Sequence, residues 1–240
     1  NINFKYENSN FGLSNFSMSI RKGQKIAIVG ENGAGKTTLT KLLLRLYDTD
    51  SGDIFINNKS IKEYDVESLR KSVGIAFQTP LIYAVSMSEN MKLYHDVPDD
   101  KLIEILEKLK LQTVFDKSGG TLDTMITKEF DENGIILSGG EAQKLGLSRL
   151  YTGDFGLLIL DEPSAALDPL AEYELSKMIF DKTNTTTTIL ISHRLSTVRD
   201  ADCIYLVENG AIVESGTHDE LMQKQGKYYD MFTKQAENYI

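Results

Sequence analysis

A glycine-rich segment with one lysine and two threonines is the part of this sequence best suited to hold phosphate. It runs Gly30–Glu31–Asn32–Gly33–Ala34–Gly35–Lys36–Thr37–Thr38 and fits the spacing G-x-x-x-x-G-K-[ST]. Its glycines allow successive backbone N–H groups to turn toward phosphate oxygens without a Cβ in the way. Lys36 would reach the β and γ phosphates, and the Thr37 hydroxyl would bind Mg²⁺. The segment predicts a phosphate loop, and a chance glycine-rich surface turn is the alternative.

Two adjacent carboxylates, Asp161 and Glu162, follow the continuous apolar run 157–160. A buried strand that ends in two acidic residues is costly unless those residues meet charged partners. In phosphate-loop enzymes the first carboxylate holds Mg²⁺ directly or through water, and the second can orient or deprotonate the attacking water. We therefore predict Asp161 as a metal ligand and Glu162 as a general base.

Two further polar residues, Gln78 and His193, stand at the ends of other strand-like runs. A lone glutamine there is usually a solvated loop residue, and a single histidine is more often structural than catalytic. The carboxyl ends of strands are, however, where open α/β sheets gather their ligand sites. The functional interpretation makes Gln78 a ligand for Mg²⁺ or the attacking water and adds His193 to the catalytic group.

The segment Ser138–Gly139–Gly140–Glu141 opens a helix-patterned run. Ser138 and Glu141 have the S-x-x-E spacing of a capping box. Two glycines in a first helical turn weaken the helix by about 1 kcal/mol each relative to alanine. Glycines at such a position would let a phosphate approach closely. The alternative is a well-capped helix with no ligand.

The apolar patterns predict an α/β phosphate-loop core with an antiparallel β subdomain and an inserted helical subdomain. The helical part is clearest where Leu102, Leu106 and Leu109 recur at helical spacing. We expect a single domain over 1–240, with residues 1–77 and 152–240 as the core and residues 78–151 as the helical subdomain. The expected strands are 2–6, 16–20, 25–29, 53–56, 73–77, 157–160, 186–192, 205–207 and 211–213, with hairpin turns at Asn57–Asn58 and Asn209–Gly210.

Composition excludes several classes of protein. The net charge of −9 argues against nucleic acid as a partner, because phosphate neutralisation needs basic patches. The single cysteine, Cys203, lies in an apolar run and is expected to be a buried strand thiol. No apolar run approaches the roughly 20 residues that cross a bilayer, so membrane contact would come through another segment or chain. The sequence begins without Met, and we expect it to be part of a longer polypeptide.

The ordered set of motifs resembles the nucleotide-binding domain of ATP-binding cassette (ABC) transporters, over nearly all 240 residues. The motifs are the Lys36 loop, Gln78, Leu-Ser-Gly-Gly-Glu at 137–141, Ile-Leu-Asp-Glu at 159–162, Ser-Ala-Ala-Leu-Asp at 164–168 and His193. The resemblance implies ATP hydrolysis by two domains that pair head to tail. It further implies roles for seven residues: adenine stacking by Tyr6, closure over the partner's γ-phosphate by Ser138, Gly139 and Gly140, catalysis by Glu162, γ-phosphate contact by His193, and communication between the two sites by Asp168.

Residues 130–134 and 191–198 are similar to segments typical of exporters in this family. This similarity implies a transmembrane domain N-terminal in the same native chain and a place at the cytoplasmic face of the cell membrane. Four residues depart from the family pattern: Asp131, Asn133, Glu141 and Lys144. Of these, Glu141 adds negative charge near a polyphosphate, and the capping box would turn it away from that phosphate.

Two other functions stay open at this point. One is a soluble ABC ATPase of DNA repair or translation, and the other is a nucleotide switch that does not hydrolyse ATP. A homodimer is preferred to a heterodimer, because the one chain carries both halves of a competent site.

Overall fold

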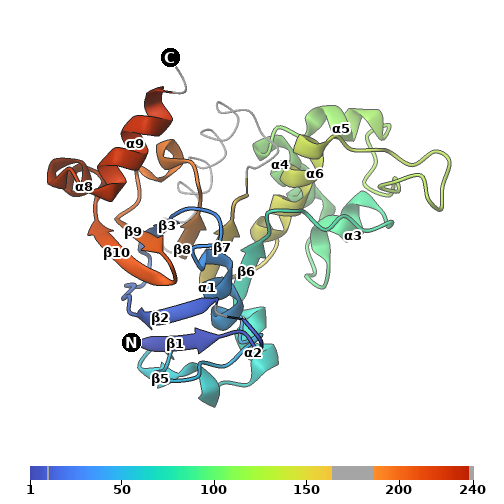
Figure 1. Ribbon diagram of the computed structural model, residues 1–240. Helices are drawn as coiled ribbons and strands as arrows, with labels where there is room; N and C mark the ends of the chain where they lie inside the picture. The colour runs from blue at the N-terminus through green and yellow to red at the C-terminus, as the bar shows by residue number, and fades with distance from the viewer. Residues whose placement is uncertain (10, 164–185, 238–240) are drawn as a thin grey trace.

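A six-stranded sheet carries the strands that the sequence predicts to end in functional residues. In the computed structural model, which describes residues 1–9, 11–163 and 186–237, the strand order is β10-β9-β3-β8-β7-β6 (Figure 1). The five strands from β9 to β6 run parallel, and only β10 is antiparallel to its neighbour. The strands of this sheet are β3 (Lys25–Val29), β6 (Val73–Ala76), β7 (Leu157–Asp161), β8 (Thr187–Ile191), β9 (Cys203–Glu208) and β10 (Ala211–Gly216).

Two small antiparallel pairs and a set of helices surround this sheet. The pairs are β1 (Ile2–Lys5) with β2 (Gly12–Phe16), and β4 (Phe55–Ile56) with β5 (Lys59–Ser60). Within the described residues the α-helices are α1 (Lys36–Leu43), α2 (Val66–Lys71), α3 (Met87–Lys92), α4 (Asp99–Lys108), α5 (Gln112–Lys117), α6 (Gly139–Ser148), α8 (His218–Lys224) and α9 (Lys227–Glu237). Short 3₁₀ turns are η1 (Ile61–Glu63), η2 (Arg149–Tyr151) and η3 (Leu195–Val198).

Strand β3 is buried on both faces, as its continuous apolar sequence predicts. Its alternate residues enter different apolar clusters because successive side chains point to opposite faces of a sheet. Ile26 and Ile28 pack in the cluster that contains Leu39 and Leu42 of α1. Ala27 and Val29 belong to the cluster that extends to α4 and α9. The phosphate loop, which directly follows β3, is therefore anchored to a strand with no exposed face.

All four helices between β6 and β7 lie in the segment expected to be helical, grouped on one side of the sheet in Figure 1. The periodicity predicted in this segment is confirmed in α4 and the residue after it, where Leu102, Leu106 and Leu109 are fully buried. Asn90 of α3 is also fully buried, and its amide nitrogen donates to Tyr83 O at 2.9 Å. A polar group at that depth is tolerated because it is hydrogen-bonded.

One strand expectation is wrong. The sequence predicted a strand over 16–20, whereas β2 runs Gly12–Phe16 and its last residue pairs with Ile2 of β1. The alternation of Met18 and Ile20 has another cause: both side chains are half-buried against the cluster beneath β1 and β2. The alternation of apolar and polar residues here reflects side chains that pack on the core, although the segment is not a strand.

Both predicted hairpin turns are confirmed. Asn57 and Asn58 connect β4 to β5 with positive φ values of 51° and 63°, and Asn209 and Gly210 connect β9 to β10 with 49° and 78°. Positive φ at both central residues is what a two-residue hairpin of type I′ requires. Cys203 lies on β9 as expected, but its side chain is half-buried rather than buried. No helix of the described residues combines the length and apolar character needed to cross a bilayer.

Candidate nucleotide-binding site

The predicted phosphate loop joins β3 to α1, and its backbone requires glycine. Gly35 has φ 111°, a left-handed value that L side chains rarely adopt. A Cβ on Gly30 would stand 2.2 Å from the carbonyl oxygen of Val207 in β9. Gly35 precedes α1 without a side chain that caps the helix. The first N–H groups of α1 therefore face the loop, which suits them to bind an anion.

Lys36, the first residue of α1, is only 6 % exposed. Its Nζ donates to Gly30 O at 2.7 Å and to Glu31 O at 3.0 Å, so the ammonium is held inside the loop. Burial lowers the pKa of Lys36, and the negative charges of Glu162 and Asp161 act in the opposite direction. The predicted phosphate ligand and the two predicted carboxylates are thus close enough to influence one another.

Asp161 ends β7 and is buried at 6 % exposure. Burial raises its pKa, a hydrogen bond with the Thr37 side chain lowers it, and Glu162 and Lys36 have smaller opposing effects. A carboxylate beside a hydroxyl is the oxygen donor chemistry that Mg²⁺ prefers. The described residues include no group of three or more His, Cys, Asp or Glu that could hold a metal. The Asp161 carboxylate and the Thr37 hydroxyl are compatible with Mg²⁺, which is usually held by one or two carboxylates together with water and phosphate oxygens.

The structure brings the three predicted catalytic residues together at the ends of three strands. Gln78 Nε2, beyond β6, donates to Glu162 Oε2 at 2.9 Å. His193 Nδ1, beyond β8, lies 3.3 Å from the same oxygen. These residues are 84 and 31 positions from Glu162 in the sequence, by their numbers. They meet because β6, β7 and β8 are parallel neighbours whose carboxyl ends lie at one edge.

Glu162 has φ 50°, so the chain turns sharply just after β7. A left-handed conformation costs a residue with a Cβ about 1–2 kcal/mol. It is held by a hydrogen bond from Glu162 N to Ile191 O of β8 at 2.9 Å. Strained backbone of this kind is concentrated at functional sites, and here it accompanies a carboxylate that meets both Gln78 and His193.

The predicted capping box at the start of α6 is confirmed. Ser138 Oγ accepts from Glu141 N at 3.3 Å, and Glu141 Oε2 accepts from Ser138 N at 2.8 Å. The hydrogen bond from Ser138 N lowers the pKa of Glu141, and Lys117 contributes in the same direction. Lys117 Nζ of α5 lies 3.1 Å from Glu141 Oε1. The Glu141 carboxylate, which departs from the family pattern, thus points into the capping box and forms an ion pair with Lys117.

Tyr6 lies in an aromatic group just after β1. Its ring stacks on Phe11 with 6.2 Å between centroids and meets Phe4 and Tyr47 edge to face. Its hydroxyl is 3.3 Å from Thr38 Oγ1 of α1. A surface pocket of about 380 Å³ opens beside it, lined by Lys5, Tyr6, Asn8 and Ser9. Tyr6 is thus next to the phosphate loop, while adenine stacking stays a prediction.

One predicted part of the site lies apart from the Lys36 loop within one chain. Ser138 and Gly139 are exposed at the start of α6, beside α5 and apart from α1 in Figure 1. Asp168 lies outside the described residues.

Sequence reasoning missed two glutamines that contact the site. Gln143 of α6 is buried, and its Nε2 is 3.4 Å from Gln78 O. Gln235 of α9 hydrogen-bonds the backbone of His193. Glutamine is common on helix surfaces, so no sequence pattern distinguishes these two positions.

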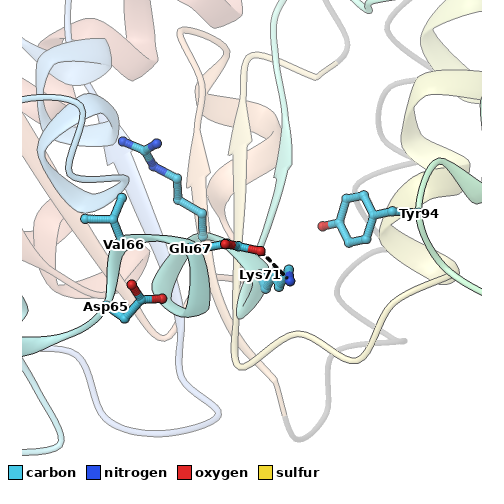
Figure 2. A pocket seen from close by; sticks show the side chains of 6 residues that line it. Asp65, Val66, Glu67, Lys71 and Tyr94 are labelled. Atoms are coloured by element: carbon cyan, nitrogen blue, oxygen red, sulfur yellow. Dashed lines mark ion pairs between the residues drawn. The ribbon is translucent and has the colours of Figure 1, made fainter.

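A second pocket, of about 500 Å³, lies away from these residues. It is formed by α2 and Tyr94, with a Glu67–Lys71 ion pair at 2.7 Å on its wall (Figure 2). It contains neither a glycine-rich loop nor a predicted site residue. Size alone therefore does not identify the nucleotide site.

Comparisons with known proteins agree with this geometry. Residues 13–165 match the family described as ABC transporter. The chain is 37 % identical over 232 residues to the mitochondrial iron–sulfur clusters transporter ATM1 of Saccharomyces cerevisiae, covering 95 % of this chain and 33 % of ATM1. It is 38 % identical over 247 residues to the subtilin transport ATP-binding protein SpaT of Bacillus subtilis, covering 100 % of this chain and 39 % of SpaT.

Comparison with solved structures also finds an ABC exporter. A solved structure of a bacterial Atm1-family ABC exporter with ATP bound matches with a TM-score of 0.89 and 30 % identity, covering 98 % of this chain and 41 % of that one. The chain thus spans about a third to two fifths of the length of these relatives. Both named relatives are transport proteins, which does not favour a soluble ABC ATPase. The chain belongs to the ABC transporter family, and it is an ATP-binding domain of the type that the exporters of this family carry.

Proposed function

We propose that this chain binds and hydrolyses ATP with Mg²⁺ and thereby powers a membrane exporter. The observation that supports hydrolysis most directly is the meeting of Gln78 and His193 at one carboxylate oxygen of Glu162. A switch that does not hydrolyse ATP has no need for this arrangement, so that alternative is not favoured.

Each residue of the group has a defined task in this proposal. Lys36 leaves the carbonyls of Gly30 and Glu31 and binds the β and γ phosphates. Thr37 and Asp161 hold Mg²⁺, which neutralises charge on the phosphate oxygens when it is bound. Glu162 accepts the proton of the attacking water. Gln78, which donates to Glu162 Oε2, would bind Mg²⁺ or the attacking water. His193 orients the Glu162 carboxylate and contacts the γ-phosphate.

The partner in this proposal is a second copy of the chain. Ser138 and Gly139 are exposed and Gly140 is half-buried at the start of α6, and the three residues would close over the partner's nucleotide. Asp168 would communicate between the two sites. A transmembrane domain, N-terminal in the same native chain, would place the dimer at the cytoplasmic face of the cell membrane. The exported substrate would be selected by that domain.

Removing the Lys36 charge is expected to weaken ATP binding at least about tenfold, because hydrogen bonds to charged groups contribute about 1.5–3 kcal/mol. Lys36→Ala and Lys36→Met both test this, and the methionine variant keeps a buried apolar stem. Titration with a fluorescent ATP analogue measures the affinity. Lys22→Ala, at an exposed lysine before β3, is the matched control. Unchanged affinity in both Lys36 variants would contradict the proposed phosphate loop.

Tyr6→Ala is expected to weaken ATP binding by about 0.5–1.5 kcal/mol, because stacking uses the aromatic ring. Tyr6→Phe should change affinity little, since the hydroxyl contact with Thr38 that it removes is long, at 3.3 Å. The same titration compares both variants with the unmodified chain. If the phenylalanine variant lost as much affinity as the alanine variant, adenine stacking would be the wrong explanation.

A further inference from the structure

One side chain of the C-terminal helix α9 hydrogen-bonds the loop that carries His193. Gln235 Nε2 donates to His193 O at 2.6 Å, and Gln235 Oε1 accepts from Leu195 N at 2.9 Å. The partners are 42 and 40 residues away in the sequence. A carbonyl oxygen can only accept and a backbone N–H can only donate, so the orientation of the amide is determined by its partners. An ionised glutamate of the same length could only accept.

Hydrogen bonds among residues of this loop and the turn η3 also stabilise it. Arg194 N donates to Ser192 Oγ at 3.0 Å, and Thr197 Oγ1 donates to Arg194 O at 2.7 Å. The turn η3 that follows has no side-chain cap at Arg194. Leu195 N is its first N–H group, and Gln235 provides the acceptor that this N–H needs. Gln235 thus caps the N-terminus of η3, although it belongs to another helix.

Apolar packing places α9 next to this loop. Leu195 and Val198 of η3 and Tyr228 of α9 are fully buried in one cluster, with Phe232 partly buried against it. The His193 side chain, in contrast, is 47 % exposed. Its imidazole is not fixed by burial, so its position depends on the backbone from which it extends.

We propose that Gln235 is a positioning residue for His193. Its carboxamide fixes the backbone on both sides of Arg194 and so sets the distance from the imidazole to Glu162, which is 3.3 Å here. The position of α9 is thereby connected to the catalytic carboxylate. This inference rests on the proposed roles of His193 and Glu162.

The test compares Gln235→Glu and Gln235→Ala with Lys234→Ala, an exposed neighbour on the same helix. A carboxylate can still accept from Leu195 N, but it cannot donate to His193 O. We expect kcat for ATP to fall in both Gln235 variants by the order of tenfold, as a misplaced catalytic group allows. Affinity for ATP should stay within about twofold, because the Lys36 loop and Tyr6 are not touched. Lys234→Ala should retain the kcat of the unmodified chain. Equal kcat in all three variants would overturn the proposal.

A spectroscopic measurement distinguishes positioning from general damage. The chain has only three histidines, His95, His193 and His218, so their imidazole NMR signals can be assigned by substitution. His218 Nδ1 is 2.9 Å from the hydroxyl of Tyr228 and therefore reports whether α9 remains docked. The Gln235 variants should shift the His193 signals and leave those of His218 in place. Equal shifts of both, or an unmoved His193, would overturn the proposal.

This second measurement does not depend on turnover. If the unmodified chain hydrolysed no ATP, the proposed function would fail, whereas the His193 signals would still show whether Gln235 positions the loop. The two failures are therefore distinguishable.

Discussion

Replacing Glu162 with glutamine is expected to lower ATP hydrolysis at least about a hundredfold, the usual scale for loss of a positioned general base. The replacement is nearly isosteric, and its amide oxygen can still accept from Gln78 Nε2, which now donates to Glu162 Oε2 at 2.9 Å. The backbone at φ 50° and its hydrogen bond to Ile191 O should be retained, because only the side chain changes. What is lost is the ability to accept a proton from water.

Binding of ATP and Mg²⁺ should survive in this variant, because Lys36, Thr37 and Asp161 are unchanged. In the proposed mechanism the dimer closes on ATP and reopens after hydrolysis, so the variant should accumulate as a closed, ATP-bound dimer. Phosphate release measures turnover, nucleotide titration measures binding, and light scattering measures mass. Glu107→Gln, which removes an exposed carboxylate on α4, controls for the change of charge. Near-normal phosphate release with no dimer would contradict the role given to Glu162.

The convergence of this site was predictable because strand ends in a parallel sheet share an edge. The sequence placed Gln78, Asp161 with Glu162, and His193 after three separate apolar runs, and the observed neighbours β6, β7 and β8 bring all three runs together. The capping box of Ser138 and Glu141 was predictable for a different reason. It is a local arrangement whose partners are three residues apart, so the spacing specifies the contact.

Contacts between distant segments were not predictable in the same way. Gln235 reaches His193 across 42 residues, and Lys117 reaches Glu141 across 24, and neither pair belongs to a spaced motif. The error at 16–20 has a related cause. Alternation of apolar and polar residues indicates which side chains are buried, but a strand also needs a neighbouring strand to pair with. The pairing of β2 with β1 ends at Phe16. The left-handed turn at Glu162 also depends on β8, which supplies its acceptor.

The exposed start of α6 leads to the second large expected effect. Ser138→Arg should leave ATP binding to a single chain intact, because Lys36 and Tyr6 are untouched, yet abolish hydrolysis and ATP-dependent dimerisation. A bulky cation at this position would keep Gly139 and Gly140 away from the partner's γ-phosphate. Phosphate release and light scattering measure the two losses.

This substitution also removes the hydroxyl that caps α6, which costs about 1 kcal/mol of helix stability. Ser138→Ala is therefore the matched control, since it removes the same hydrogen bond to Glu141 N without adding bulk. Most of the dimerisation should persist in the alanine variant. Equal damage in both variants would show that the cap, and not access to the partner's phosphate, explains the loss.

Mixing the Ser138→Arg variant with the Lys36→Ala variant, which we expect to hydrolyse little ATP because it binds ATP weakly, tests directly whether sites are shared between chains. A dimer of one Ser138→Arg chain and one Lys36→Ala chain contains one site in which the Lys36 loop and the Ser138 segment are both unmodified. Its other site carries both changes. Mixed samples should therefore recover activity that neither variant has alone. Inactivity despite proven mixed dimers leaves two explanations: either the sites are not shared, or hydrolysis needs both sites.

A crosslink separates these two explanations. Ser138→Cys, combined with a thiol placed beside the phosphate loop of the partner, should form a disulfide in the ATP-bound Glu162→Gln background, where the closed dimer persists. The native Cys203 is half-buried on β9 and is replaced in both chains to prevent competing products. Formation of the crosslink without recovery of activity would mean that the sites are shared and must act together. Failure of the crosslink to form in the closed dimer would rule out the shared site, because the start of α6 would then not face the partner's phosphate.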